Sequence, residues 1–336
     1  MTAPWITYRP ELKVLDCTIR DGGLINNHQF DEGLVKAVYE TCVEAGLDYM
    51  EIGYKNAKRL FPPDKFGAFR HSDEESIRRI VGDHDAESTG LKLAVMADAG
   101  KSDWKTDLIS RDQSVLDMIR VACYVHQIPE AVEMIHHAHE LGYETTCNLM
   151  AISIVQEAEI DQSLEVIAQT PVDVVVVVDS FGALYREQIE LLVGKYLEAV
   201  QGTGKEVGIH AHNNQQLAFA NTIESIILGS NRIDATMAGL GRGAGNCPME
   251  LLIGFLRNPK FKQRPILKLL ESHLLPLREE VEWGPLVPYN VTGQYNQHPR
   301  TAMDGALDPT RFASSNFTTR LHVMFRCSYI RGPGWL

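Results

Sequence analysis

Two histidines one residue apart, His210 and His212, form the most informative pair for chemistry in this chain. They end a short apolar run, 207–209, and two asparagines, Asn213 and Asn214, follow them. Side chains two positions apart on a β-strand point to the same side, so both imidazoles should face one way at the carboxyl end of the strand. Two such rings can bind a divalent metal. The same spacing also occurs where histidines are only hydrogen-bonded or solvated, so the interpretation needs support from elsewhere in the chain.

That support comes from polar residues at the ends of other apolar runs. They are Arg20, Asp21, Glu51, Tyr54, Arg120, Asn148, Asp179 and Ser180. Asp21 can complete a three-ligand site with the histidine pair and leave positions on the metal open, as catalysis requires. The alternative is a turn residue, because Asp-Gly is a frequent turn dipeptide. We favour the ligand, because a buried carboxylate beside Arg20 is costly unless it is neutralised.

Two further features indicate anion binding. Arg20 is either a salt-bridge partner of Asp21 or a planar fork of donors for a carboxylate or a developing enolate oxygen. The glycine cluster at 239–246 is either a flexible loop or a place where the backbone at Gly241 and Gly243 approaches a ligand. In the second case Arg242 would strengthen the attraction for an anion.

The elements that must position these groups alternate in type along the chain. Short β-branched runs recur between segments of helical period, which is typical of repeated βα units. Eight strands are expected, at 13–17, 48–53, 92–97, 118–123, 144–150, 173–179, 206–212 and 232–237. Helices are expected at 33–45, 73–80, 129–141, 160–168, 187–200 and 216–228. Eight strands predict an α/β fold of the TIM (β/α)8 barrel type. An open doubly wound sheet is the alternative, but it usually has a glycine-rich phosphate loop after its first strand, which is missing here.

The βα pattern stops near residue 246. We therefore expect a catalytic barrel at 1–245 and a carboxyl-terminal helical extension at 246–300 that contributes to the active site. Within the extension, 249–256 and 266–281 are predicted to be helical and to lead into a loop rich in Pro, Tyr, Asn and His. The last stretch, 301–336, has no clear period and is either a partly ordered tail or an oligomer contact.

Composition excludes several classes of partner. The chain has 336 residues and a net charge of −12, which disfavours nonspecific binding to nucleic acid or to anionic membranes. Its six cysteines are scattered without CxxC spacing, which indicates a reducing cytoplasm. The first residues lack the layout of a secretion signal, and the longest apolar run is too short to cross a bilayer.

Four motifs together resemble one superfamily. They are Asp16-x-Thr18-x-Arg20-Asp21-Gly22, Asp179-Ser180-x-Gly182, His210-x-His212-Asn213-Asn214 and Gly239-Leu240-Gly241-x-Gly243-x-Gly245-Asn246-x-Pro248-x-Glu250. In this order they resemble the DRE-TIM metallolyases, which are HMG-CoA lyase-like. Within that superfamily the chain is most similar to the 4-hydroxy-2-oxovalerate aldolases and related aldolase catalytic domains. The resemblance runs from about residue 12 to about residue 300.

The resemblance implies a metal-dependent aldolase, a carbon–carbon lyase that cleaves or forms a 4-hydroxy-2-oxo acid from pyruvate, or a related 2-oxo acid, and an aldehyde. Asp21, His210 and His212 would hold a divalent cation, with Mn²⁺ preferred and Mg²⁺ or Co²⁺ as alternatives. Arg20 and the cation would stabilise the enolate, and Ser180 would contact the oxo acid. Asn148, Gly241, Arg242 and Gly243 complete the expected substrate site.

One position departs from the family pattern. The aldolase base is a histidine three residues beyond the metal aspartate, where this chain has Leu24. His28 and His298 are the candidate replacements, and Tyr295 matches the family's tyrosine from the carboxyl-terminal extension. His28 can equally be an ordinary loop histidine. Three further cations, Lys55, Lys58 and Arg59, follow the second strand and either hold an anionic group of a larger substrate or lie in a solvated loop.

Other functions fit the same residues less well. A Claisen-type acyltransferase that condenses acetyl-CoA with a 2-oxo acid is one alternative. A barrel that has lost its chemistry and acts as a binding subunit is another, because the family histidine is missing. Homo-oligomerisation is expected. Aldolases of this family often associate with an aldehyde dehydrogenase, but no residue of this chain specifies that partner.

Overall fold

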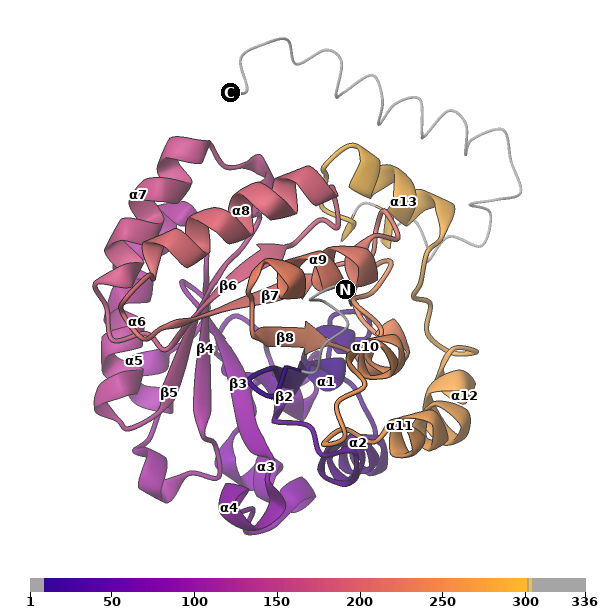
Figure 1. Cartoon of the computed structure of the whole chain (residues 1–336). Coiled ribbons are helices and arrows are strands. Elements are labelled where there is room, and N and C mark those ends of the chain that lie inside the picture. Colours follow the sequence, from indigo (N-terminus) through magenta and orange to yellow (C-terminus); the bar gives the residue numbers. More distant parts are fainter. Residues whose placement is uncertain (1–8, 301, 304–336) are drawn as a thin grey trace.

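Eight parallel strands close into a barrel in the computed structural model, which describes residues 9–300 and 302–303 (Figure 1). The strands are β1 (Lys13–Asp16), β2 (Tyr49–Tyr54), β3 (Lys92–Asp98), β4 (Met118–Cys123), β5 (Glu144–Leu149), β6 (Val174–Asp179), β7 (Glu206–Ala211) and β8 (Arg232–Ala235). Each strand pairs with its neighbours in sequence order, and β1 pairs with β8 to close the barrel. The predicted TIM barrel is confirmed, with every predicted strand present to within two residues at either end.

Helices on the outside of the barrel join successive strands (Figure 1). The α-helices of the barrel are α1 (Thr18–Gly22), α2 (Glu32–Ala45), α3 (Glu74–Val81), α4 (Ala86–Thr89), α5 (Trp104–Asp107), α6 (Ile128–Glu140), α7 (Glu157–Ala168), α8 (Arg186–Ala199) and α9 (Ala218–Leu228). Short 3-10 turns are η2 (Ala68–Arg70), η3 (Arg111–Gln113), η4 (Val125–Gln127), η5 (Ile152–Ile154) and η6 (Met237–Gly239). All six predicted outer helices are therefore present.

The strand β6 shows why these sequences form a barrel. Val175 and Val177 face outward and belong to the main apolar core between strands and helices. Val174, Val176 and Val178 face inward and pack on one another inside the barrel. A strand buried on both faces must be apolar at nearly every position, as parallel barrel strands are.

The carboxyl-terminal extension differs from expectation in two places. It contains α10 (Met249–Leu256), α11 (Gln263–Leu269), the π-helical turn η7 (Leu270–Leu274), α12 (Leu275–Leu277) and α13 (Val287–Gln294). The predicted helix 266–281 starts earlier and ends at Leu277, just past Pro276. The predicted loop rich in Pro, Tyr, Asn and His is partly wrong, because it contains α13. This helix starts at Val287, and Pro288 lies in its first turn, where proline is tolerated.

Helix α13 is tied to the barrel by a side chain from the loop after β7. Asn214 Nδ2 donates to the carbonyl oxygen of Tyr289 and to Thr292 Oγ1, both at 3.3 Å. This places the segment after α13 above the barrel mouth. Of the predicted tail 301–336, all but 302–303 lies outside the described residues. Within the described ranges, the model has no helix with the length and apolar character needed to cross a membrane.

Candidate metal and active site

A single cavity at the carboxyl ends of the strands gathers most of the predicted site residues. It has a volume of about 520 Å³ including its open mouth. The site residues among its lining are Arg20, Asp21, Tyr54, Asn148, Ser180, His210, His212, Arg242 and His298. They come from the ends of five strands, the loop after β8 and the segment after α13. The carboxyl end of a barrel is where such enzymes place their chemistry.

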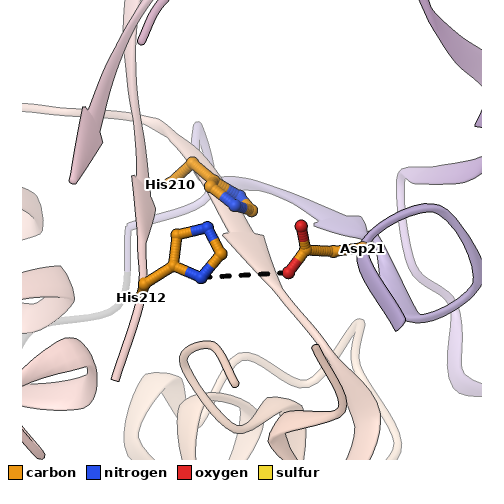
Figure 2. Close-up of side chains that lie close together, drawn as sticks. All are labelled: Asp21, His210 and His212. Atoms are coloured by element: carbon orange, nitrogen blue, oxygen red, sulfur yellow. Dashed lines mark ion pairs between the residues drawn. The ribbon is translucent and has the colours of Figure 1, made fainter. Parts of the chain in front are cut away.

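Asp21, His210 and His212 converge within this cavity, as the sequence predicts. One ligand atom from each of them lies within 4.8 Å of the others, and all three residues are buried (Figure 2). Asp21 lies on the short helix α1 directly after β1, and the histidines lie at the end of β7. The Nδ1 atom of His212 is 3.9 Å from Oδ2 of Asp21. Two imidazoles and one carboxylate offer the nitrogen and oxygen donors that a divalent cation requires.

His210 is oriented by a residue that the motifs do not identify as part of the site. Its Nδ1 lies 3.1 Å from Oδ2 of Asp234, a buried carboxylate on β8. Because that carboxylate only accepts, the ring proton is on Nδ1 and the lone pair is on Nε2. The Nε2 atom is buried and has no hydrogen-bond partner in the described structure. A free lone pair at this position fits a metal ligand.

Asp21 is held from two sides. Arg20 Nη1 donates to Oδ1 at 2.8 Å, and Asn246 Nδ2 donates to Oδ2 at 2.6 Å. Each carboxylate oxygen keeps a second lone pair for a cation. A Cβ on Gly241 would lie 2.3 Å from Asn246 Nδ2 and 2.5 Å from Asp21 Oδ2. Gly241 is therefore needed here because the loop backbone passes directly over these two side chains.

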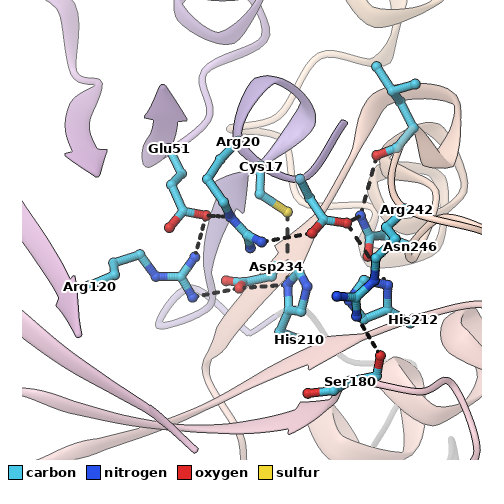
Figure 3. Close-up of polar contacts among 12 residues, drawn as sticks. Cys17, Arg20, Glu51, Arg120, Ser180, His210, His212, Asp234, Arg242 and Asn246 are labelled. Atoms are coloured by element: carbon cyan, nitrogen blue, oxygen red, sulfur yellow. Dashed lines mark hydrogen bonds and ion pairs between the residues drawn. The ribbon is translucent and has the colours of Figure 1, made fainter. Parts of the chain in front are cut away.

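A chain of buried ion pairs connects the two ends of the metal site (Figure 3). Glu51 Oε2 accepts from Arg20 Nε at 2.7 Å and from Arg120 Nη1 at 2.9 Å. Arg120 Nη2 then donates at 2.6 Å to Asp234, the carboxylate that orients His210. Glu51 and Arg120 thus act behind the cavity wall, where they fix the positions of the residues in front of them.

The local electrostatics keep two of the candidate ligands, Asp21 and His212, in metal-binding protonation states. Burial raises the pKa of Asp21, but the positive charges around it, Arg20 among them, outweigh this effect, so its pKa lies below the usual range and the carboxylate is ionised. Burial lowers the pKa of His212 well below its ordinary value despite the nearby Asp21, so this ring is neutral. Protons therefore do not compete with a cation for the donor atoms of Asp21 and His212 near neutral pH.

The substrate-facing wall is partly as predicted. Ser180 Oγ accepts from the Ala151 backbone N–H at 2.8 Å, which leaves its hydroxyl proton for a ligand. Asn148 lies on the wall with Ser180 and Arg242. The described cavity lining does not include Gly241 and Gly243, whose roles are close packing of the loop. Gly243 has a φ of +60°, and a Cβ there would lie 3.0 Å from Pro299.

The structure separates the three candidates for proton transfer. His298 lies on the cavity wall, whereas His28 and Tyr295 are outside the described lining. His28 is buried, with Nε2 3.0 Å from the carbonyl oxygen of Arg20, and its ring packs edge-on against Tyr54. Burial, followed by the charge of Arg70, lowers the pKa of His28 to about 3. Leu24, at the family histidine position, lines the cavity itself.

The wall position of Tyr54 has a local cause in β2. A β-bulge between Glu51 and Gly53 shifts the register with β3. Glu51 and Tyr54, three residues apart, therefore both face the barrel interior. Burial raises the pKa of Tyr54 to about 12, so its hydroxyl stays protonated.

The three cations after β2 do not reach the cavity. Lys58 pairs with Asp73 at 3.7 Å and Arg59 pairs with Asp103 at 2.9 Å, both on the exposed surface. Lys55 is buried, and burial lowers its pKa. These placements favour the solvated-loop interpretation for Lys58 and Arg59.

Two second-layer residues, Asp234 and Asn246, were not assigned as site residues from sequence. A usable signal existed for Asp234, because it is a charged residue in the middle of the predicted strand 232–237. Inside a closed barrel such a residue must have a partner. Asn246 belongs to the glycine-rich motif at 239–250, but only the fold shows that its amide reaches Asp21.

Comparison with known proteins agrees with this geometry. The family model described as HMGL-like matches residues 11–271 of the chain. The chain belongs to the HMGL-like family. The predicted superfamily is therefore confirmed, and the match includes all three candidate metal ligands of this HMGL-like barrel.

Several curated relatives are aldolases. A 4-hydroxy-2-oxovalerate aldolase from Pelotomaculum thermopropionicum is 30% identical over 255 residues, which cover 75% of this chain and 72% of the relative. A second protein of that name, from Bacillus cereus, is 29% identical and covers 82% and 80%. An oxaloacetate decarboxylase from Mycobacterium tuberculosis is 28% identical and covers 73% and 69%.

Solved structures show the same HMGL-like barrel. The N-terminal domain of a protein described as an aldolase from Bacteroides vulgatus superposes with a TM-score of 0.75 at 27% identity, covering 92% of this chain and 100% of that one. An HMG-CoA lyase from Bacillus subtilis gives a TM-score of 0.65 at 15% identity, covering 84% and 98%. The second similarity is one of fold.

Proposed function

We propose that this protein is a metal-dependent aldolase, a carbon–carbon lyase that cleaves or forms a 4-hydroxy-2-oxo acid. The observation that carries the proposal is the convergence of Asp21, His210 and His212 beside an arginine with an unpaired donor. Arg20 Nη2 is buried and has no hydrogen-bond partner in the described structure. The family and its aldolase relatives support the same reaction.

The residues present fit a divalent cation. His210 Nε2 and His212 Nδ1 are both buried without hydrogen-bond partners among the described residues, and Asp21 is ionised between them. When bound there, the cation supplies Lewis-acid stabilisation of the negative charge that develops on the 2-oxo oxygen. Mn²⁺ is the proposed ion, with Mg²⁺ or Co²⁺ as alternatives.

The protein's own groups account for the rest of the reaction. In cleavage the C3–C4 bond breaks, its electron pair becomes the C2–C3 double bond of the enolate, and C4–OH becomes an aldehyde carbonyl. The free Nη2 of Arg20 can donate to the oxygen that gains charge. The Ser180 hydroxyl can donate to the oxo acid carboxylate. Leu24, Met96 and Val178 make part of the cavity wall apolar. The proton that leaves the C4 hydroxyl is the one that C3 of the enolate must receive for pyruvate to form, so the base that takes it can return it there.

His298 is the proposed acceptor of the C4 hydroxyl proton. Its Nε2 lies 3.0 Å from Arg242 Nη1, and its Nδ1 lies 3.0 Å from the backbone N–H of Arg300. Both neighbours are donors, which favours a neutral ring, and its single lone pair must give up one of these contacts to take the substrate proton. Burial and the charge of Arg242 lower the pKa of His298 to about 3.

The proposal is tested by chelation and by ligand variants. Cleavage of a 4-hydroxy-2-oxo acid should stop in EDTA and return with Mn²⁺. The variants Asp21→Asn and His212→Ala should be inactive while their circular dichroism remains that of the native barrel. Activity that persists after chelation would refute the proposal.

Decarboxylation of an oxo dicarboxylic acid is a second candidate, and one observation favours it. Loss of CO₂ from such a substrate leaves the same enolate but requires no base to take a hydroxyl proton, which suits a site with Leu24 at the family histidine position. One curated relative is an oxaloacetate decarboxylase. Release of CO₂ from oxaloacetate, measured above the metal-only rate without aldehyde, distinguishes the two reactions.

A further inference from the structure

Arg242 is a cation on the cavity wall without an acidic partner. Its Nη2 donates to the carbonyl oxygen of Ser180 at 2.7 Å, and its Nη1 lies 3.0 Å from His298 Nε2. No carboxylate in the described part of the chain forms an ion pair with it, whereas Arg20, on the same wall, has two such partners. The Nε atom of Arg242 is buried and has no hydrogen-bond partner among the described residues. Arg242 is only partly buried, and the charge of Asp21 acts on it without forming an ion pair, so its free N–H donors are open to an anion from a ligand.

The free donors of Arg242 suit a carboxylate. A guanidinium has five N–H groups, and the two contacts above leave the Nε–H and one hydrogen on each terminal nitrogen. Two neighbouring N–H groups are sufficient for a bidentate carboxylate. Asp21 is the one acidic residue in the described lining, and the metal site uses it. The anion must therefore come from the substrate.

The contact between Arg242 and His298 indicates which half of the substrate brings that anion. In the proposed reaction, the base acts on the hydroxyl of C4, the carbon that becomes the aldehyde. The 2-oxo acid end is assigned to Arg20 and the metal ligands. A cation that contacts the proposed base therefore lies beside the substituent on C4.

We propose that Arg242 binds a carboxylate on the aldehyde half and so determines acceptor specificity. This inference rests on the aldolase function proposed above. The substrates it implies are 4-hydroxy-2-oxo dicarboxylic acids, whose acceptor is an aldehyde with its own carboxylate in place of a neutral one.

The same arrangement links substrate identity to proton transfer. The pKa of His298 is low because of burial and then because of the charge of Arg242, with Arg300 and Lys101 acting in the same direction. A carboxylate bound to Arg242 offsets part of that charge. The ring then becomes a stronger base when the anionic substrate is present.

An equilibrium experiment tests the inference without turnover. 2-Oxoglutarate and 2-oxopentanoate differ only in a terminal carboxylate against a methyl group, and neither has the 4-hydroxyl needed for cleavage. Calorimetry on the Mn²⁺-loaded protein should give binding of 2-oxoglutarate at least 10-fold tighter. Arg242→Ala should reduce that ratio below about 3-fold, Arg242→Lys should retain part of it, and Arg186→Ala, on the exposed face of α8, should leave it unchanged.

Two results would overturn the inference. Equal affinity of the native protein for both acids is one, because no anion site for the second carboxylate would then exist. An Arg242→Ala variant that keeps the native fold but weakens both acids by the same factor is the other, because Arg242 would then serve the common 2-oxo acid end.

Kinetics separate this inference from the underlying function. With pyruvate as donor, kcat/KM for glyoxylate should exceed that for acetaldehyde by at least 10-fold, and Arg242→Ala should remove the preference mainly through the KM for glyoxylate. Exchange of pyruvate methyl protons in D₂O, followed by NMR, reports enolisation without any acceptor. No exchange in the Mn²⁺-loaded native protein would contradict the aldolase function. Exchange together with a preference for acetaldehyde would contradict only the role of Arg242.

Discussion

At the scale of single residues, the proposed metal ligands depend on the buried side chains behind them. Asp234 contacts His210 and Arg120 at once, at 3.1 and 2.6 Å. Removing one member of a buried charge network leaves the others unpaired, which typically costs about 3–5 kcal/mol. Function at this site therefore depends on carboxylates that never contact substrate.

The first prediction concerns Asp234. Asp234→Asn removes the charge that keeps the His210 proton on Nδ1, so Mn²⁺ affinity should fall by about 10- to 100-fold. Isothermal titration of the metal-free protein with Mn²⁺ measures the change. Asp161→Asn, which removes a carboxylate paired with Lys195 on the outer surface, is the control and should bind Mn²⁺ normally. Unchanged Mn²⁺ affinity in Asp234→Asn would show that His210 needs no orienting carboxylate.

The second prediction concerns His28 and pH. Its folded pKa of about 3 lies below its ordinary value of 6.5, so below pH 6.5 the unfolded chain takes up a proton that the folded chain does not. The folded state is therefore destabilised as pH falls from about 6.5 towards 3. At pH 4.5 the loss for this residue is about 2–3 kcal/mol.

The variant His28→Asn isolates this contribution, because Asn does not titrate and tolerates the positive φ of 60°. Urea unfolding in EDTA should show the native protein losing more stability than the variant between pH 7.5 and 4.5. Parallel losses in the two proteins would mean that His28 is readily protonated in the folded state. A role in proton transfer would then have to be reconsidered.

At the scale of elements, the sequence was most informative where burial was complete. Strand β6 follows from its local pattern, because its valines are buried on both faces. Helix α2 follows from its local pattern too, because its apolar residues are buried on one face. Helix α13 was missed because Pro, Asn, Thr and Gly have low helix propensity, and its contacts with Asn214 stabilise it from outside. The same limit applies to the site, where the ligands follow from motifs but the position of His298 depends on how α13 docks.

The loop after β8 gives the third prediction. Gly241→Ala would force apart Asn246 and Asp21, because the added Cβ has no room between them. We expect at least a 10-fold loss of Mn²⁺ affinity and a lower melting temperature. Gly194→Ala in α8 is the matched control, since nothing lies within 4 Å of its Cβ and the helix should gain up to about 1 kcal/mol. Normal metal binding by Gly241→Ala would show that the loop can move away without disturbing Asp21.

At the scale of the whole molecule, the two ends of the barrel have different roles. At the amino end, Arg232 pairs with Glu144 and Glu206, and Lys13 and Lys92 join the same acids. These ion pairs close the end of the barrel that carries no predicted site. At the carboxyl end, buried donor atoms remain without partners. Stability and function are thus placed at opposite ends, as is usual for this fold.

The fourth prediction follows from those unpartnered atoms. A cation that binds only the folded protein stabilises it by about 2.7 kcal/mol at 100 times its Kd. For a chain of this size the melting temperature should rise by about 4 °C when Mn²⁺ replaces EDTA. Differential scanning fluorimetry measures the shift, and Asp21→Asn should abolish it. An equal shift in that variant would place the ion elsewhere.

The linked ion pairs from Asp21 to His210 also bear on how this protein could diversify. The residues of this linkage come from α1, β2, β4, β7 and β8 and hold one another in place, so a change in any of them should weaken binding of the cation. Leu24, Arg242 and His298 lie outside that linkage. Mutagenesis libraries restricted to Leu24 and Arg242 should therefore yield enzymes with altered aldehyde preference that still enolise pyruvate, whereas libraries at Glu51 or Arg120 should yield inactive protein.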